Sequence, residues 1–193
     1  MRAPLFKGLY EATPALQALL NALQSPEQWL AAYSSSLLST WLPEWQRLTQ
    51  ANYNTQHKTH HFSLDTHTLA VVEKTQQASG FKALSASQRQ LTLLSALLHD
   101  IEKTTGPCDF RPFLPADQLH PLKSAETAAR RLYCLGLSAD AIQRVYTLVH
   151  HHQLFGRLFV LFGGNPPEDA LMRIALKIRS QALLDCLVAL TEA

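Results

Sequence analysis

An apolar run with helical spacing, which ends in a histidine and an aspartate, constrains the fold of this chain more than any other feature. The apolar positions of this run are Leu91, Leu94, Leu98 and Ile101. They recur every three or four residues, as on the buried face of a helix. Ser85 and Gln88 have the spacing of a capping box, so we expect the helix to begin near Ser85. No segment alternates apolar and polar residues convincingly enough to predict a strand, and the sequence therefore predicts an all-α fold.

Capping and breaking residues predict further helices along the chain. The expected starts are Ser25-Pro26, Leu64, Ser85, His120-Pro121 and Ser138. Gly80 and Gly136 are expected to end two of these helices, because glycine readily adopts the left-handed conformation of a helix C-cap. A turn at 163–167 is expected to precede one final helix that carries Leu171 to Leu187. The segment 104–119 is rich in proline, and we expect a long loop there that covers the site.

Composition narrows the classes of protein to which this chain can belong. The 193 residues suffice for one domain with a full core, and a hydrophobic content of 47% is typical of a globular chain. A formal net charge of +2 gives no strong signal for a nucleic-acid partner. No apolar stretch is long enough to span a bilayer, and the N-terminus does not resemble a secretory signal. Three scattered cysteines favour a reducing cytoplasm. The sequence does not determine the oligomeric state.

The end of the apolar run carries the strongest functional signal. His99 and Asp100 are adjacent, so the backbone alone holds an imidazole and a carboxylate together. These two groups suit a divalent transition metal at a hydrolytic site. At the edge of a core they need partners, and a metal is one such partner. Lys103 lies one helical turn after His99, where its charge could clamp a phosphate. The alternative interpretation is a surface histidine beside a helix-end aspartate.

Other candidate ligands are spread along the chain. They are His67, His120, His151, His152 and Asp185. In the helix that begins at Ser138, the inward face consists of Ile142, Val145 and Val149, and His152 lies on this face too. His151 is the preceding residue and therefore points in a different direction around the helix. The alternatives remain open: His120 could simply precede Pro121, the histidine run could be a solvated cluster at a helix end, and Asp185 could be an exposed polar residue.

The ordered set of histidines and acids resembles the HD superfamily of metal-dependent phosphohydrolases. The residues that flank it are similar to the HD domain of PII uridylyltransferase/uridylyl-removing enzymes, and bacterial tRNA nucleotidyltransferases have a related domain. The similar segments are Leu-Pro-Glu-Trp at 42–45, Leu-Asp-Thr-His-Thr-Leu at 64–69, Leu-Val-His-His-His-Gln-Leu-Phe at 148–155 and Leu-Val-Ala-Leu-Thr-Glu-Ala at 187–193. The resemblance covers about residues 42–193. It implies an HD-domain helical bundle over 46–193 with an N-terminal helical extension over 1–45.

The resemblance also implies a metal site and a reaction. His67, His99, Asp100 and a late aspartate would hold one ion, and His120 with His151 or His152 would hold a second. The ion would be manganese, iron, nickel, zinc or magnesium. The implied activity is hydrolysis of a phosphate monoester or phosphodiester in a phosphorylated small molecule, a nucleotide or a nucleotidylated substrate. Asp100 would bind metal and take a proton from water, and Lys103 would neutralise phosphoryl charge.

Two departures from the family pattern leave alternatives open. The families carry the late aspartate after a Thr-x-Ala sequence, whereas this sequence ends at Thr191-Glu192-Ala193. Asp185 or a residue beyond Ala193 would then be the last ligand, unless the protein does not need one. Glu102 occupies a position where related hydrolases often have glycine, and it could repel an anionic substrate or pair with Lys103. The competing functions are a non-catalytic regulatory or binding module, or the HD part of a larger nucleotidyltransferase-type protein.

Overall fold

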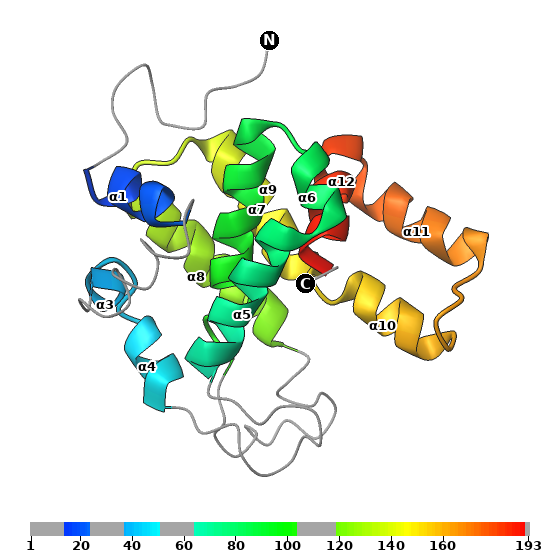
Figure 1. The fold of residues 1–193 in the computed structure, drawn as a ribbon, viewed down its shortest axis with the longest axis horizontal. Coiled ribbons are helices and arrows are strands. Elements are labelled where there is room, and N and C mark those ends of the chain that lie inside the picture. The colour runs from blue at the N-terminus through cyan, green and yellow to red at the C-terminus, as the bar shows by residue number, and fades with distance from the viewer. Residues whose placement is uncertain (1–13, 24–36, 51–63, 104–118, 192–193) are drawn as a thin grey trace.

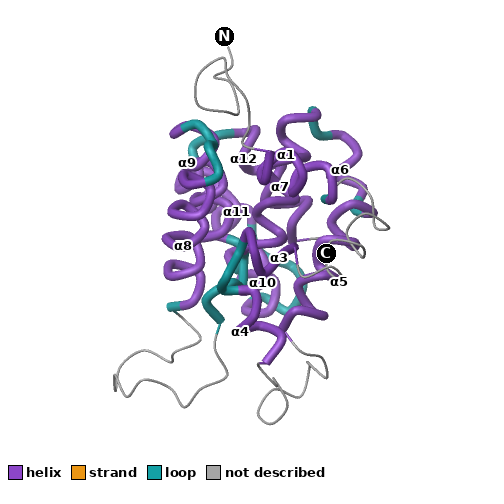
Figure 2. Tube along the Cα trace, turned by 90° about the vertical axis from the view of Figure 1, so that its left-hand side faces the viewer, coloured by secondary structure: helices purple, strands orange, loops and turns teal. Residues whose placement is uncertain are grey.

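The computed structural model describes residues 14–23, 37–50, 64–103 and 119–191. All the regular elements in these residues are helices, which confirms the predicted all-α fold (Figures 1 and 2). The helices are α1 (Pro14–Ala22), α3 (Leu37–Trp41), α4 (Trp45–Gln50), α5 (Leu64–Gln77), α6 (Ser79–Ala83), α7 (Ala86–Leu98), α8 (His120–Cys134), α9 (Ala139–His151), α10 (Leu154–Leu161), α11 (Glu168–Ile178) and α12 (Gln181–Thr191). None of them combines the length and the apolar character that a membrane span requires.

Helix α7 is the central element of the bundle. It packs against α5, α8, α9 and α12, and every residue from Leu91 to Asp100 is buried (Figure 1). A helix enclosed on all sides must satisfy its polar side chains internally. Thr92 and Ser95 do so by donating to the carbonyl oxygens of Gln88 and Leu91, each at 2.8 Å. The apolar run therefore forms the core, and its last turn brings polar residues into the interior.

Several features of the sequence form the local structures that they predict. Ser85 and Gln88 make both hydrogen bonds of a capping box at the start of α7. The Ser138 side chain accepts a hydrogen bond from the Ala141 backbone at the start of α9. Gly136 ends the turn after α8 with a φ of 94°, a conformation that costs glycine little. These features depend on neighbours within a few residues, which is why the sequence reveals them.

Two local predictions were wrong, and one helix was not predicted. Gly80 does not end a helix, because the chain breaks at the extended Ala78 and Gly80 lies inside α6. The expected final helix is two helices, α11 and α12, which separate at Arg179 with its left-handed φ of 54°. Helix α10 was not predicted: its sequence, Leu-Phe-Gly-Arg-Leu-Phe-Val-Leu, is apolar nearly throughout, and Leu154, Phe155 and Leu158 form the face that packs against the core.

The N-terminal helices share the core of the bundle. Leu19 and Leu23 of the α1 segment and Leu48 of α4 belong to the same cluster of buried residues as α7. Gln76 of α5 also donates a 2.6 Å hydrogen bond to the carbonyl oxygen of Leu23. The division into residues 1–45 and 46–193 stays a prediction. The predicted helix start at Ser25-Pro26 and nearly all of the predicted 104–119 loop lie outside the described residues.

The register of α9 provides a test of the core. Val145 is fully buried on α9, whereas Val188 on α12 is 39% exposed. We expect Val145→Ala to lower the free energy of unfolding by about 2 kcal/mol, because it removes two buried methyl groups and leaves a cavity. Val188→Ala should change it by less than about 0.5 kcal/mol. Urea unfolding followed by circular dichroism measures both. Equal losses of unfolding free energy in the two variants would contradict the placement of Val145 on the buried face of α9.

Candidate metal centre

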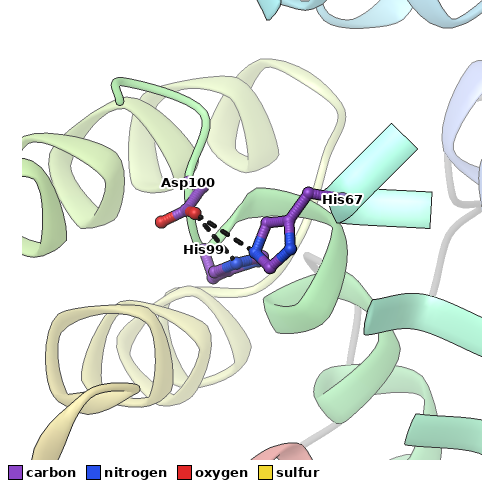
Figure 3. A group of neighbouring side chains, drawn as sticks. All are labelled: His67, His99 and Asp100. Atoms are coloured by element: carbon purple, nitrogen blue, oxygen red, sulfur yellow. Dashed lines mark ion pairs between the residues drawn. The ribbon is translucent and has the colours of Figure 1, made fainter. Parts of the chain in front are cut away.

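Four helix ends meet at one end of the bundle and bring the candidate ligands together. His67 lies in the first turn of α5, and His120 is the first residue of α8. His99 is the C-cap residue of α7, and His152 is the C-cap residue of α9. Asp100 follows His99 directly. Residues up to 85 positions apart in the sequence are thereby gathered around one carboxylate, and Figure 3 shows His67 and His99 next to Asp100.

Five basic groups surround the Asp100 carboxylate, which is only 1% exposed. Around Oδ2 lie His67 Nε2 at 3.6 Å, His99 Nε2 at 3.2 Å and Lys103 Nζ at 3.0 Å. Around Oδ1 lie His120 Nε2 at 3.0 Å and His152 Nε2 at 3.6 Å. All four imidazoles therefore present the same ring nitrogen to the same side chain.

Backbone carbonyls fix the orientation of two of these imidazoles. His99 Nδ1 lies 2.7 Å from the carbonyl oxygen of Ala96, and His152 Nδ1 lies 2.7 Å from that of Val149. A carbonyl oxygen only accepts hydrogen bonds, so Nδ1 carries the proton in both rings. In the neutral ring, Nε2 then has a free lone pair directed at Asp100. This is the arrangement found in histidines that bind metals.

Electrostatics favour the metal-binding protonation states of Asp100 and His152. Burial alone would raise the pKa of Asp100, but the charge of His99, the close nitrogens of His120 and His99, and Lys103 together hold that pKa well below its usual value. Burial, followed by the charge of His99, lowers the pKa of His152 to about 3. At neutral pH the site therefore offers an ionised carboxylate beside a neutral imidazole, and both groups bind metals in these forms.

One buried atom supports the fit of a cation. Among the described residues, no donor makes a hydrogen bond of acceptable geometry to Asp100 Oδ1, although His120 Nε2 is only 3.0 Å away. A buried carboxylate oxygen without a donor is costly, and a metal ion would satisfy it. Two groups of ligand atoms lie within 4.8 Å of one another, namely His67, His99 and Asp100, and Asp100, His120 and His152. This buried His/Asp cluster could hold a metal ion.

Asp185 does not reach the cluster. Its neighbour Cys186 packs against the carbonyl oxygen of Gln88, and Gln88 Nε2 bonds to the carbonyl oxygen of Ala182. Asp185 therefore lies beside Gln88, near the start of α7. Gln88 precedes Asp100 by twelve residues, which is roughly 18 Å along a helix. The Asp185 carboxylate instead accepts a 2.7 Å hydrogen bond from Gln181. In this arrangement α12 would have to slide along α7 for Asp185 to become a ligand.

His151 also lies outside both ligand groups. Its ring stacks on His150 at 4.5 Å, and His150 contacts Tyr146. The reason is helical rotation, because a step of about 100° turns His151 away from the direction in which His152 points. Burial, followed by the nearby His150 and Lys177, lowers the pKa of His151 to about 4.

The residues after Asp100 point in different directions. Lys103 is directed at Asp100, with 11% of its side chain exposed. The Glu102 carboxylate accepts hydrogen bonds from Arg47 at 3.1 Å and from Thr127 at 2.7 Å. These contacts with α4 and α8 neutralise Glu102 and direct its charge towards neighbours outside the cluster, which weakens the expectation that it repels an anionic substrate.

Sequence reasoning missed one residue at this site. Gln153 Nε2 lies 3.0 Å from His120 Nε2, so this side chain is in direct contact with a candidate ligand. Gln153 follows the histidine run immediately, and that position was the only signal in the sequence. It is also the N-cap residue of α10, so it joins the cluster to that helix.

Comparisons with models of protein families and with curated proteins find no match to this sequence.

A first prediction separates the two aspartates. Asp100→Asn should lose most of the bound metal, because the carboxylate belongs to both ligand groups. Asp185→Asn is the matched control and should retain wild-type metal content, because Asp185 lies at the other end of α7. Elemental analysis after loading with manganese or zinc and dialysis measures both. Equal metal loss from the two variants, or a wild type that binds no metal, would contradict this assignment.

A second prediction concerns the number of ions. If both ligand groups are occupied, wild-type protein should approach two metals per chain at saturation, and His120→Ala should reduce this to about one. His151→Ala should leave the stoichiometry unchanged, since this ring lies outside both groups. Isothermal titration with elemental analysis measures the stoichiometry. A wild type that saturates at one ion, with no change in His120→Ala, would limit the site to a single metal.

Proposed function

We propose that this chain is an HD-type, metal-dependent phosphohydrolase that cleaves a phosphate monoester or phosphodiester. One observation carries the proposal: four imidazole nitrogens and the Lys103 ammonium group surround the buried Asp100 carboxylate. Imidazole and carboxylate ligands are typical of hydrolytic metal centres, and a fixed cation beside them suits an anionic substrate. The substrates that fit best are phosphorylated small molecules, nucleotides and nucleotidylated proteins.

The donor set narrows the choice of metal. Four imidazoles with one carboxylate favour manganese, iron, nickel or zinc over magnesium, which prefers oxygen ligands. Because Asp100 belongs to both ligand groups, the site would accept one ion or two. A divalent ion in this position supplies Lewis acidity towards a phosphoryl oxygen and lowers the pKa of water.

The exposure of the side chains indicates how a substrate would approach. His67 is 26% exposed and Lys103 is 11% exposed, whereas His99 and His120 are 6% and 3% exposed. We infer that a phosphate enters on the side of His67 and meets Lys103 there. Lys103 would then stabilise the negative charge that accumulates on the phosphoryl oxygens. Asp100, whose lowered pKa keeps it ionised, would bind the metal and orient the other ligands, and the same low pKa makes it a weak acceptor for a proton from water.

A non-catalytic binding or regulatory module is the main alternative. In the described residues Asp100 is the only carboxylate in either ligand group, so the cluster has little negative charge to balance two divalent ions. The same cluster would then bind metal or phosphate without turnover. A further alternative is that this chain is the HD part of a larger nucleotidyltransferase-type protein. Phosphoesterase activity of this chain alone is compatible with that alternative.

Lys103 separates enzyme from binding module. We expect wild-type protein loaded with manganese or zinc to hydrolyse a member of a panel of phosphate monoesters, cyclic nucleotides and nucleotidylated proteins. Lys103→Gln should keep its metal and lower kcat by about 100-fold, as removal of one charge-stabilising group does in other enzymes. Lys123→Gln on α8, which is exposed, is the matched control and should behave as wild type.

The outcomes of this screen are distinct. Metal-loaded protein that cleaves no member of the panel would favour the binding module. Hydrolysis that Lys103→Gln leaves unchanged would contradict the role of Lys103. Loss of metal from Lys103→Gln would mean that this residue maintains the site itself.

A further inference from the structure

Helices α10 and α11, with the turn that joins them, form an arm that projects from the bundle (Figure 1). The base of the arm is anchored, because Leu154, Phe155 and Leu158 pack against the core. The rest of α10 is not covered: this helix has no buried residue, and Val160 and Leu161 are 84% and 75% exposed. Exposed apolar groups of this size on one element indicate a protein contact.

Helix α11 also carries exposed apolar side chains, on its outer face. Its inner face is formed by Ala170, Ile174 and Ile178, which are buried. The opposite face carries Met172 and Leu176, which are 52% and 64% exposed. Residues four apart lie on one side of a helix, so these two side chains form a short apolar stripe directed away from the bundle.

Charged residues lie at the two ends of this stripe and have opposite signs. Asp169, in the first turn of α11, precedes Met172 by three residues on the same side of the helix. Arg179 is the C-cap residue, and its Nε donates a 3.2 Å hydrogen bond to the carbonyl oxygen of Leu176. The outer face of α11 therefore runs from an acid through two apolar side chains to a base.

This order of residues is complementary to itself in the antiparallel direction. Consider a two-fold axis perpendicular to α11 at the level of Ile174. Met172 and Leu176 each lie two residues from this level, on opposite sides, so the axis places Met172 of one copy opposite Leu176 of the other. The same operation places Asp169 opposite Arg179, so that both ends of the helix pair bring opposite charges together. Asp169 also pairs with Arg173 on its own helix at 3.9 Å, and that contact is highly exposed.

We propose that the arm is a homodimer interface, in which α11 packs antiparallel against α11 of a second copy. A two-fold interface uses the same patch on both partners, and this patch has matching apolar and charged positions. A membrane surface fits less well, because helices that lie on membranes have a polar face rich in lysine and arginine, whereas this face begins with an acid.

Sedimentation analysis of the full chain over a range of micromolar concentrations tests the interface. We expect wild-type protein to be dimeric. Leu176→Glu should raise the dissociation constant by about 100-fold, because it places a charge in the centre of the contact. Tyr133→Glu is the control at a comparably exposed position on α8, since Tyr133 is 61% exposed, and it should leave the dimer intact. Circular dichroism checks that each variant is folded.

Charge reversal tests the antiparallel register. Asp169→Arg and Arg179→Asp should each weaken the dimer by about tenfold, and the double variant should recover most of the loss because opposite charges again face each other. Aspartate tolerates the left-handed conformation at position 179. A monomeric wild type, a dimer that survives Leu176→Glu, equal disruption by Tyr133→Glu, or no recovery in the double variant would overturn the proposal.

Discussion

The arrangement of the bundle depends on a carboxylate that is almost completely removed from water. Asp100 is 1% exposed, and an ionised group in such a position is strongly destabilising unless partners compensate for the lost hydration. The compensation comes from His99, His120 and Lys103, at the end of α7 and the start of α8, while His67 of α5 and His152 of α9 approach the same carboxylate to 3.6 Å. The positions at which these helices begin and end are therefore linked to one side chain, and so is the chemistry that the site can perform.

Backbone geometry reinforces this arrangement. The carbonyl oxygens of Ala96 and Val149, in the last turns of α7 and α9, orient the rings of His99 and His152. The negative dipole ends of α7 and α9 reach the cluster, but so do the positive ends of α5 and α8, so the carboxylate of Asp100 is the group that favours a cation there. Contacts of Glu102 with Arg47 and Thr127 connect the turn after Asp100 to α4 and α8. A site with several independent supports keeps its geometry better than one on a free loop.

Local sequence features were sufficient for the parts of this protein that depend on near neighbours. The capping box at Ser85, the cap at Ser138 and the buried face of α7 follow from interactions within about one helical turn. The inward direction of His152 follows from the register of α9 in the same way. The adjacency of His99 and Asp100 likewise identified the centre of the candidate site.

The sequence by itself thus determined an all-α chain, the starts of α5, α7, α8 and α9, and the histidines and aspartate at the centre of the cluster. Only the tertiary structure decided that Asp185 lies at the opposite end of α7, that His151 turns outward and that Gln153 contacts His120. It also decided that α10 stands on the surface despite its apolar sequence. The physical reason is that a residue's spacing fixes its direction on its own helix, whereas the placement of one helix along another depends on packing between residues far apart in the chain.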